Sequence, residues 1–319
     1  MSAASDLHVV LGAGGARGGA VVRELTARGR RVRAVGRTLA ARPDVETLRA
    51  DAATPAGAEE ACAGAAVVYH CASPAYHRWA WKFPPLTATI ADATAAQGAK
   101  LVFADNLYMY GPVDAPMTED LPYAARDSQG VVRARMAEAL LSRHHAGDLR
   151  VALGRASDYY GPGGVNTIVG DTVFGAAAAG KVARWVGRLD QPHTLSYLPD
   201  MARALVVLGE DARGDGRAWH LPAAEALTGA RFLDLVFAQA GRPARTASVG
   251  RPMQRVLGLV NPTVRALGET WYQRDRPFVS DSGRFTETFG PFDPTPHPEA
   301  IAATLDWYRA RAAEGSSPA

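Results

Sequence analysis

Hydrophobic and polar positions along the first half of the chain follow two alternating patterns. Short apolar runs end at a glycine or a polar residue, and longer amphipathic segments separate them. The apolar runs predict buried strands at 7–11, 31–35, 45–49, 66–71, 101–104 and 150–154. The segments between them predict helices at 20–28, 54–62, 85–97 and 131–145. This alternation is typical of parallel strands joined by crossover helices, a doubly wound α/β sheet.

The alternation ends after about Tyr160, where proline and glycine become frequent. We therefore predict two domains. Residues 1–160 form a Rossmann domain, which the chain re-enters near 194–208, and residues 161–319 form mainly a smaller substrate-binding domain.

Composition excludes several classes of protein. Hydrophobic residues make up 47% and charged residues 21% of the 319 positions, as in an ordinary globular protein. The net charge is only +3 and the arginines are scattered, which argues against a nucleic-acid partner. Cys62 and Cys71 lack the spacing of a metal site or a redox pair. No apolar run approaches the roughly 20 residues of a membrane helix, and no signal peptide is apparent. We expect a cytoplasmic protein with a small-molecule substrate and neither a metal nor a membrane partner.

A glycine-rich turn follows the first predicted strand and precedes the first predicted helix. Gly12, Gly15 and Gly18 are spaced three apart, with Gly14 in the same turn. The first permits a tight turn, the second lets backbone approach a pyrophosphate, and the third lets helix and strand pack closely. The start of a helix also presents free N–H groups and a partial positive charge. In this context a dinucleotide site is favoured over a plain structural turn.

The residue after the second strand distinguishes the two nicotinamide dinucleotides. An acidic residue there bonds the ribose 2′-OH of NAD, whereas an arginine accommodates the 2′-phosphate of NADP. Arg37 occupies this place, so we expect NADP(H) in preference to NAD(H), with Arg17 as a second clamp. A solvated surface arginine is the alternative. Asp51, just past the third strand, is a candidate for the adenine edge or an ordinary loop aspartate.

Further segments match one family in their order and spacing. They are 67–73 (Val-Val-Tyr-His-Cys-Ala-Ser), 108–112 (Tyr-Met-Tyr-Gly-Pro), 154–163, 193–202, 285–291 and 305–308. With the glycine spacing, they make nearly the whole chain resemble the extended short-chain dehydrogenase/reductase family, which includes NAD-dependent epimerases and dehydratases. The resemblance implies a Rossmann fold with Cys71, Ala72 and Ser73 in the loop on the nicotinamide side.

The resemblance breaks down at the catalytic residues. Enzymes of this family usually carry a serine or threonine, a tyrosine that acts as acid or base, and a lysine that lowers its pKa and holds the ribose. Alignment places Asn106, Val131 and Arg135 at these positions. Valine cannot move a proton, and arginine can bind ribose hydroxyls but stays charged. The chain therefore resembles an atypical member without the Tyr-x-x-x-Lys pair.

Three explanations of the missing acid stay open. Another tyrosine replaces it, with Tyr108 and Tyr159 the nearest by motif position. Alternatively His77, Asp158 or His193 acts, or water or the substrate itself serves.

Four residues are candidates for substrate contact. Tyr76 and His77 follow the fourth strand, where they would line a pocket beside the nicotinamide or only pack the loop. Asp158 occupies a place where the family often has a substrate-contacting asparagine. His193 occupies a place that sugar-nucleotide enzymes often fill with arginine. That exchange weakens a nucleotide-sugar interpretation, because a diphosphate favours a fixed cation.

These observations support three hypotheses. The first is an NADP(H)-dependent oxidoreductase acting on a carbonyl or related group of a small, moderately apolar substrate, with Asn106 as polariser, Tyr108 as proton donor and Arg135 on the ribose. The second is an epimerase, dehydratase or cyclase without net redox change, and the third is a sensor that binds NADP(H) without turnover. The resemblance also implies a homodimer through the helices at 85–97 and 131–145.

Overall fold

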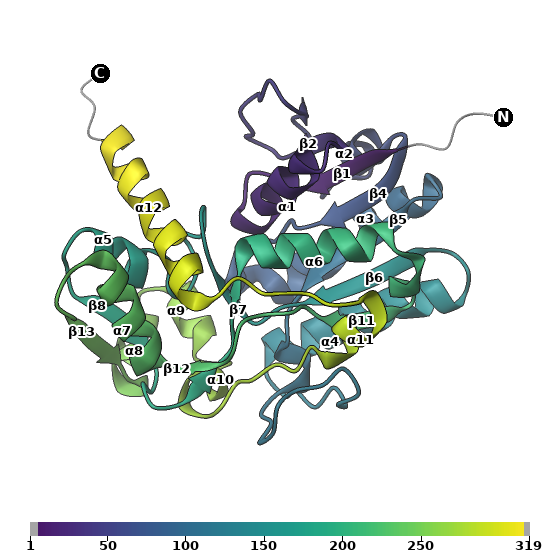
Figure 1. The fold of residues 1–319 in the computed structure, drawn as a ribbon. Helices are drawn as coiled ribbons and strands as arrows, with labels where there is room; N and C mark the ends of the chain where they lie inside the picture. Colours follow the sequence, from purple (N-terminus) through teal and green to yellow (C-terminus); the bar gives the residue numbers. More distant parts are fainter. Residues whose placement is uncertain (1–5, 316–319) are drawn as a thin grey trace.

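A seven-stranded parallel sheet forms the centre of the computed structural model, which describes residues 6–315 (Figure 1). The strands lie in the order β11-β6-β5-β4-β1-β2-β3, and every neighbouring pair is parallel. Their bounds are β1 (Leu7–Leu11), β2 (Arg31–Val35), β3 (Glu46–Leu48), β4 (Ala65–His70), β5 (Lys100–Asp105), β6 (Arg150–Arg155) and β11 (Arg217–His220). The first six lie where the hydrophobic runs predicted strands, and β11 was not predicted.

Helices cover both faces of the sheet, each over its own hydrophobic core. One face carries α1 (Ala16–Ala27) and α6 (Leu198–Glu210), which pack side by side. The other face carries α2 (Pro55–Cys62), α3 (Trp79–Ala96) and α4 (Ser128–His145). The α/β doubly wound class is therefore confirmed.

Helix α3 begins earlier than the predicted helix at 85–97. In the structure Pro84 and Pro85 lie inside a helix that starts at Trp79. Trp79 and Phe83 are buried in the sheet core, and this burial anchors the additional turn.

The second part of the chain forms a smaller body beside the carboxyl ends of the strands. It holds three strand pairs: β7 (Asp158–Tyr160) with β10 (Leu195–Tyr197), β8 (Ala183–Val186) with β13 (Thr246–Val249), and β9 (Pro192–His193) with β12 (Leu227–Thr228). Its helices are α5 (Ala176–Ala178), α7 (Gly229–Ala240), α8 (Arg251–Gly258), α9 (Pro262–Leu267), α10 (Tyr272–Asp275) and α12 (His297–Gly315). Short 3-10 or π turns occur along the whole chain. They are η1 (Tyr76–Arg78) after β4, η2 (Tyr108–Tyr110) after β5, η3 (Gly170–Gly175) and η4 (Ala212–Gly214).

The chain crosses between the two bodies more than once. Phe174, Phe232 and Ile301 belong to the core of the smaller body. Residues of α6 and β11 and of α11 (Gly283–Phe289) instead join the core of the sheet. No helix in the described range 6–315 is long and apolar enough to cross a bilayer.

The order of the strands in the sheet indicates where a ligand site lies. It reverses between β1 and β4, so a crevice opens at their carboxyl ends. The turns after β1, β4 and β5 all reach this edge, where the smaller body covers it (Figure 1).

Candidate functional site

The glycine turn after β1 fits tightly where it packs and is open where a ligand would lie. Gly12 has a φ of +81°, and a Cβ there would lie 2.7 Å from the backbone of Ala72. A Cβ on Gly18 would lie 2.3 Å from the Gly12 oxygen. Gly14 and Gly15 are exposed, and a Cβ on either would make only ordinary or slightly close contacts. Gly12 and Gly18 therefore hold the turn together, while Gly14 and Gly15 leave its backbone accessible.

The start of α1 suits an anion. Gly15 is the N-cap, no side chain caps the helix, and no acidic residue lies in its first turn. Its first amides and the helix dipole therefore face the crevice uncompensated. This arrangement fits the pyrophosphate of a dinucleotide.

The loop after β4 forms the opposite wall of the turn. The Cys71 amide donates to the Leu11 carbonyl (3.0 Å), and Ala72 packs on Gly12. Burial raises the pKa of the Cys71 thiol to about 11, so it stays protonated. The Ser73 hydroxyl is exposed and donates to the Pro74 carbonyl (3.1 Å). Cys71 and Ala72 thus shape the crevice by packing rather than by charge.

Residues predicted for the adenine end behave differently from one another. Arg37 is exposed at the end of β2, as a ligand for a 2′-phosphate would be. Asp51 closes a turn before α2, where its carboxylate accepts from the Ala53 amide (3.1 Å).

Arg17 does not lie beside Arg37. Its guanidinium donates to the Ala104 carbonyl (2.9 Å) and lies 5.9 Å from the Tyr159 ring. Ala104 lies in β5, and two strands, β4 and β1, separate β5 from β2 in the sheet. The predicted second clamp is therefore wrong, and Arg17 instead lines the inner end of the crevice.

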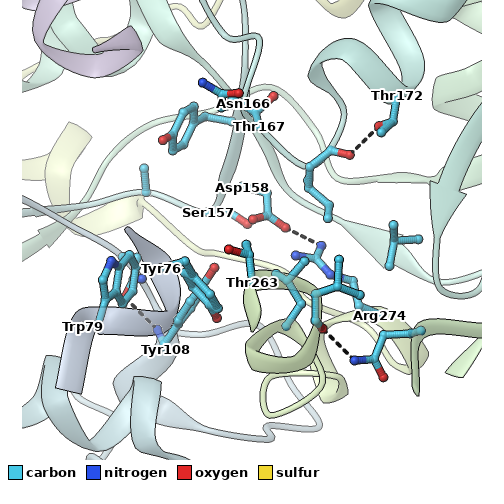
Figure 2. A pocket seen from close by; sticks show the side chains of 18 of the residues that line it. Tyr76, Trp79, Tyr108, Ser157, Asp158, Asn166, Thr167, Thr172, Thr263 and Arg274 are labelled. Atoms are coloured by element: carbon cyan, nitrogen blue, oxygen red, sulfur yellow. Dashed lines mark hydrogen bonds and ion pairs between the residues drawn. The ribbon is translucent and has the colours of Figure 1, made fainter. Parts of the chain in front are cut away.

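A cavity of about 470 Å³ continues from that inner end between the two bodies. Figure 2 shows Tyr76, Trp79 and Tyr108 grouped on one side, Arg274 on the other, and Asp158 between them. Most of its surface is apolar, with contributions from Ile168, Val186, Met201, Val249, Leu257, Val264 and Leu267.

Asp105, the last residue of β5, holds two buried arginines. Arg133 Nη1 donates to Asp105 Oδ1 (3.1 Å), and Arg155 Nε donates to Oδ2 (3.2 Å). The Arg133 guanidinium also lies 4.1 Å from the Trp79 ring and 4.4 Å from the Phe83 ring. Burial lowers the pKa of Arg133 to about 10 despite Asp105, so it remains a cation at neutral pH.

Arg133, and not Arg135, is the α4 cation of the cavity. Arg135 is exposed and does not line the cavity, whereas Arg133 does. The prediction for Arg135 was therefore two residues out of register. Arg133 lines the cavity, and its Nε is buried without a hydrogen-bond partner among residues 6–315.

Asn106 and Tyr108 lie together at the end of β5. The Asn106 Oδ1 accepts from the Tyr108 amide (3.2 Å), so Asn106 does cap the turn, and it also lines the cavity. The Tyr108 ring packs near Trp79 and Tyr76. Burial raises the pKa of Tyr108 well above its usual value, which keeps the hydroxyl protonated.

Asp158 is a carboxylate fixed between Arg274 and His193. Arg274 Nη1 forms a short ion pair with Asp158 Oδ2, and His193 Nε2 lies 3.0 Å from the same oxygen. Burial alone would raise the pKa of Asp158, but Arg274 and His193 outweigh it and hold that pKa well below its usual value. Asp158 is thus a poor proton donor. His193 is buried behind it and is absent from the cavity lining, so a direct substrate contact is not supported.

Tyr76 and His77 attach the loop after β4 to the smaller body. The Tyr76 hydroxyl shares a hydrogen bond with Thr270 (3.2 Å), and His77 Nδ1 lies 3.2 Å from Thr263 Oγ1. Tyr76 lines the cavity, whereas His77 does not. The aromatic loop therefore both packs and shapes the pocket.

Ser157 and Arg274, like Asp105 and Arg133, line the cavity and were not candidates in the sequence analysis. Ser157 lies within the quoted 154–163 segment, and its hydroxyl is buried without a partner in the described part of the chain. A polar atom left in this way is a candidate for a ligand contact. Arg274 carried no local signal, because its partner Asp158 is 116 positions away. No group of three or more metal-ligating side chains gathers within residues 6–315.

Comparison with models of known protein families identifies the family of this chain. The model of the NAD dependent epimerase/dehydratase family matches residues 8–221. This chain belongs to that family. The resemblance drawn from the glycine turn and the later segments is therefore confirmed, while no curated protein sequence matches the chain.

Solved structures support the same fold across the whole chain. A nucleoside-diphosphate-sugar epimerase from Pseudomonas aeruginosa is 19% identical, with a TM-score of 0.74, and the match covers 96% of this chain and 98% of that one. The dTDP-glucose 4,6-dehydratase of Bacillus anthracis, in complex with NAD, is 14% identical with a TM-score of 0.80 and coverage of 95% and 96%. MoeE5, in complex with UDP-glucuronic acid and NAD, is 21% identical with a TM-score of 0.77 and coverage of 96% and 99%.

Proposed function

We propose that this family member is an NADP(H)-dependent reductase for a carbonyl or related group on a small, moderately apolar substrate. The observation that carries the proposal is the Tyr108 hydroxyl in the cavity wall at the carboxyl end of β5. Its burial keeps it protonated, and a protonated hydroxyl can donate to an oxygen that gains negative charge during reduction.

The cavity's other residues support the same direction. The Asn106 side-chain amide can donate to the same substrate oxygen, because only its Oδ1 is engaged by the turn. The Ser157 hydroxyl offers a further contact. Asp158 is too firmly held by Arg274 and His193 to serve as the acid.

The charges of the cavity favour a substrate without a diphosphate. Four arginines line it. Arg17, Arg133 and Arg274 already bond protein groups, whereas Arg184 is exposed and forms no ion pair within residues 6–315. A nucleotide sugar, the substrate in the names of several structural neighbours, would find only Arg184 unpaired for its diphosphate. A mostly apolar wall instead favours a ligand with one polar end.

The residues around the crevice fit a nicotinamide dinucleotide, as in the neighbours solved with NAD. The α1 amides would hold the pyrophosphate, Arg37 the 2′-phosphate of NADP, and the free Nε of Arg133 the inner end. When bound, the cofactor supplies the hydride. The chain orients it, excludes water with the smaller body, and donates the proton from Tyr108.

An absorbance assay of NADPH consumption with a panel of aldehydes and ketones tests the proposal. We expect Tyr108→Phe to lower kcat by about 100-fold or more, because it removes the proton donor. Tyr76→Phe is the matched control. Its hydroxyl is engaged by Thr270, and we expect kcat to fall by less than about tenfold.

Three results would contradict this function. Product formed without a change in NADPH would favour the epimerase, dehydratase or cyclase hypothesis. Tight cofactor binding without turnover across the panel would favour a sensor. Equal kcat for wild type and Tyr108→Phe would remove Tyr108 from the mechanism.

Cofactor preference has its own test. We expect Arg37→Gln to weaken NADP⁺ binding by about tenfold or more, because a charge-assisted contact to the 2′-phosphate is lost. NAD⁺ binding should not change. Arg31→Gln, at the opposite end of β2, should affect neither. Titration calorimetry measures both affinities, and equal losses for the two cofactors would exclude Arg37 as the selector.

The cytoplasmic location and the homodimer stay predictions. Light scattering of the purified chain measures the oligomeric state directly.

A further inference from the structure

The α8–α9 hairpin, residues 251–267, covers one side of the cavity. Leu257, Val264 and Leu267 line the cavity from it, and Gln254 Nε2 donates to the Val264 carbonyl (2.7 Å) to join the two helices. The His77–Thr263 contact attaches α9 to the loop after β4. The hairpin is therefore the part of the smaller body that closes the site against the sheet.

Helix α8 has its apolar side turned outward. A surface helix normally buries its apolar stripe and exposes polar residues. Here Gln254 and Gly258 are the buried positions. The exposed apolar residues of the helix and the turn after it are Met253 (54%), Val256 (61%), Leu257 (44%), Leu259 (80%) and Val260 (85%).

The charge around this apolar surface has a single sign. Arg251, Arg255 and Arg265 are exposed, and none of them forms an ion pair within residues 6–315. Arg242 and Arg245 precede them, and no aspartate or glutamate occurs from 241 to 268. The next acidic residue along the chain, Glu269, is engaged by Ser128. An apolar surface whose own segment carries only arginines is complementary to an interface that is apolar inside and anionic outside.

We propose that the α8–α9 hairpin is a docking surface for the anionic headgroups and outer acyl region of a lipid bilayer. The turn at Leu259 and Val260 enters the boundary between headgroups and acyl chains, while the three arginines contact lipid phosphates. The hairpin lies on the surface and does not span it, so the absence of a spanning helix among the described residues is no obstacle. This departs from the sequence-based expectation of no membrane partner.

Charge also decides against a second copy of the chain as the occupant. Two-fold self-association would bring the same patch of each copy together. Arg251, Arg255 and Arg265 of the two copies would then converge without any acidic residue from this segment to balance them.

Vesicle flotation of the full-length protein tests the proposal independently of any enzymatic activity. We expect the protein to float with phosphatidylcholine vesicles that contain phosphatidylserine and to stay behind with phosphatidylcholine alone. Added salt should weaken the association, because the attraction of the arginines is screened. A protein that does not float with anionic vesicles would overturn the proposal.

Two triple variants separate the apolar and charged contributions. Val256→Ser/Leu259→Ser/Val260→Ser removes the apolar tip, and Arg251→Gln/Arg255→Gln/Arg265→Gln removes the charges. We expect each to lower the vesicle partition coefficient at least tenfold. Because all six side chains are exposed, thermal unfolding should stay unchanged.

The matched control removes the same charge elsewhere. Arg135→Gln/Arg150→Gln/Arg217→Gln changes three exposed arginines on α4 and at the amino ends of β6 and β11. This control variant should bind vesicles as tightly as wild type. If it loses as much binding as the hairpin arginine variant, the net positive charge of the protein explains the binding and the proposal is overturned. Size-exclusion chromatography supplies the last arm. A wild-type dimer that becomes monomeric in the serine variant would assign the surface to a second copy instead.

Discussion

Two carboxylates that line the cavity, Asp105 and Asp158, differ in their surroundings and in the residues they bind. Asp105 ends a central strand, is fully enclosed, and binds two arginines from the same Rossmann body. Asp158 lies in β7 of the smaller body and lines the cavity, and its partners Arg274 and His193 come from α10 and β9 of the same body. The first cluster stabilises the sheet edge on which the site is built. The second joins three segments of the smaller body at the cavity wall.

The Asp105 cluster also extends into a polar network of buried residues that do not line the cavity. Arg155 Nη1 donates to the Tyr110 hydroxyl (2.6 Å), which in turn lies 2.8 Å from His220 Nε2. Burial would lower the pKa of Arg155, but Asp105 and Tyr110 outweigh it and raise that pKa. Both clusters contribute residues to the cavity wall. They differ in origin, because the first is built from β5, α4 and β6 of the sheet body and the second from β7, β9 and α10 of the smaller body.

The largest expected effect comes from breaking the enclosed cluster. Asp105→Asn leaves Arg133 and Arg155 buried without a negative charge, which should lower the free energy of unfolding by about 3–5 kcal/mol. Urea denaturation measures the loss. Asp190→Asn in the exposed pair Arg188–Asp190 is the control and should leave the midpoint unchanged. A loss no larger than that of the control would mean that Asp105 is not a framework charge.

A smaller and pH-dependent effect is expected for Asp158→Asn. The charged contact to Arg274 should contribute about 2 kcal/mol at neutral pH. The pKa of Asp158 is lowered on folding, so its contribution is complete above the unfolded pKa of about 4 and is lost only as the pH falls below it. The stability difference between wild type and variant should therefore stay constant from pH 8 to about pH 5 and narrow in stronger acid.

Thermal unfolding of wild type and Asp158→Asn across that pH range measures the stability difference. A stability difference that closes near neutral pH would contradict the lowered pKa of Asp158.

Local patterns explain why the Rossmann half could be predicted from the sequence. Short apolar runs and the glycine spacing each determine a strand or a turn without reference to distant residues. Strand β11 was missed because Arg217–His220 is short and follows a long excursion through the smaller body. Asp158–Arg274 was missed because nothing local links residues so far apart.

The error at Arg135 has a simple geometric cause. Each residue turns an α-helix by about 100°, so a shift of two positions rotates a side chain by roughly 200°. That rotation separates Arg133, which faces the cavity, from Arg135, which faces solvent. A motif can therefore locate the right helix turn and still select the wrong side chain when the family's tyrosine and lysine are replaced.

The hydrogen bonds that hold the smaller body against the loop after β4 and the start of α4 set how readily the cavity exchanges its contents. Tyr76 to Thr270, His77 to Thr263 and the short contact from Ser128 to Glu269 form the latch. At about 1 kcal/mol each, they amount to roughly 3 kcal/mol, which corresponds to about one unlatched molecule in a few hundred. A latch of that strength retains a ligand against diffusion and still releases it without loss of the sheet beneath.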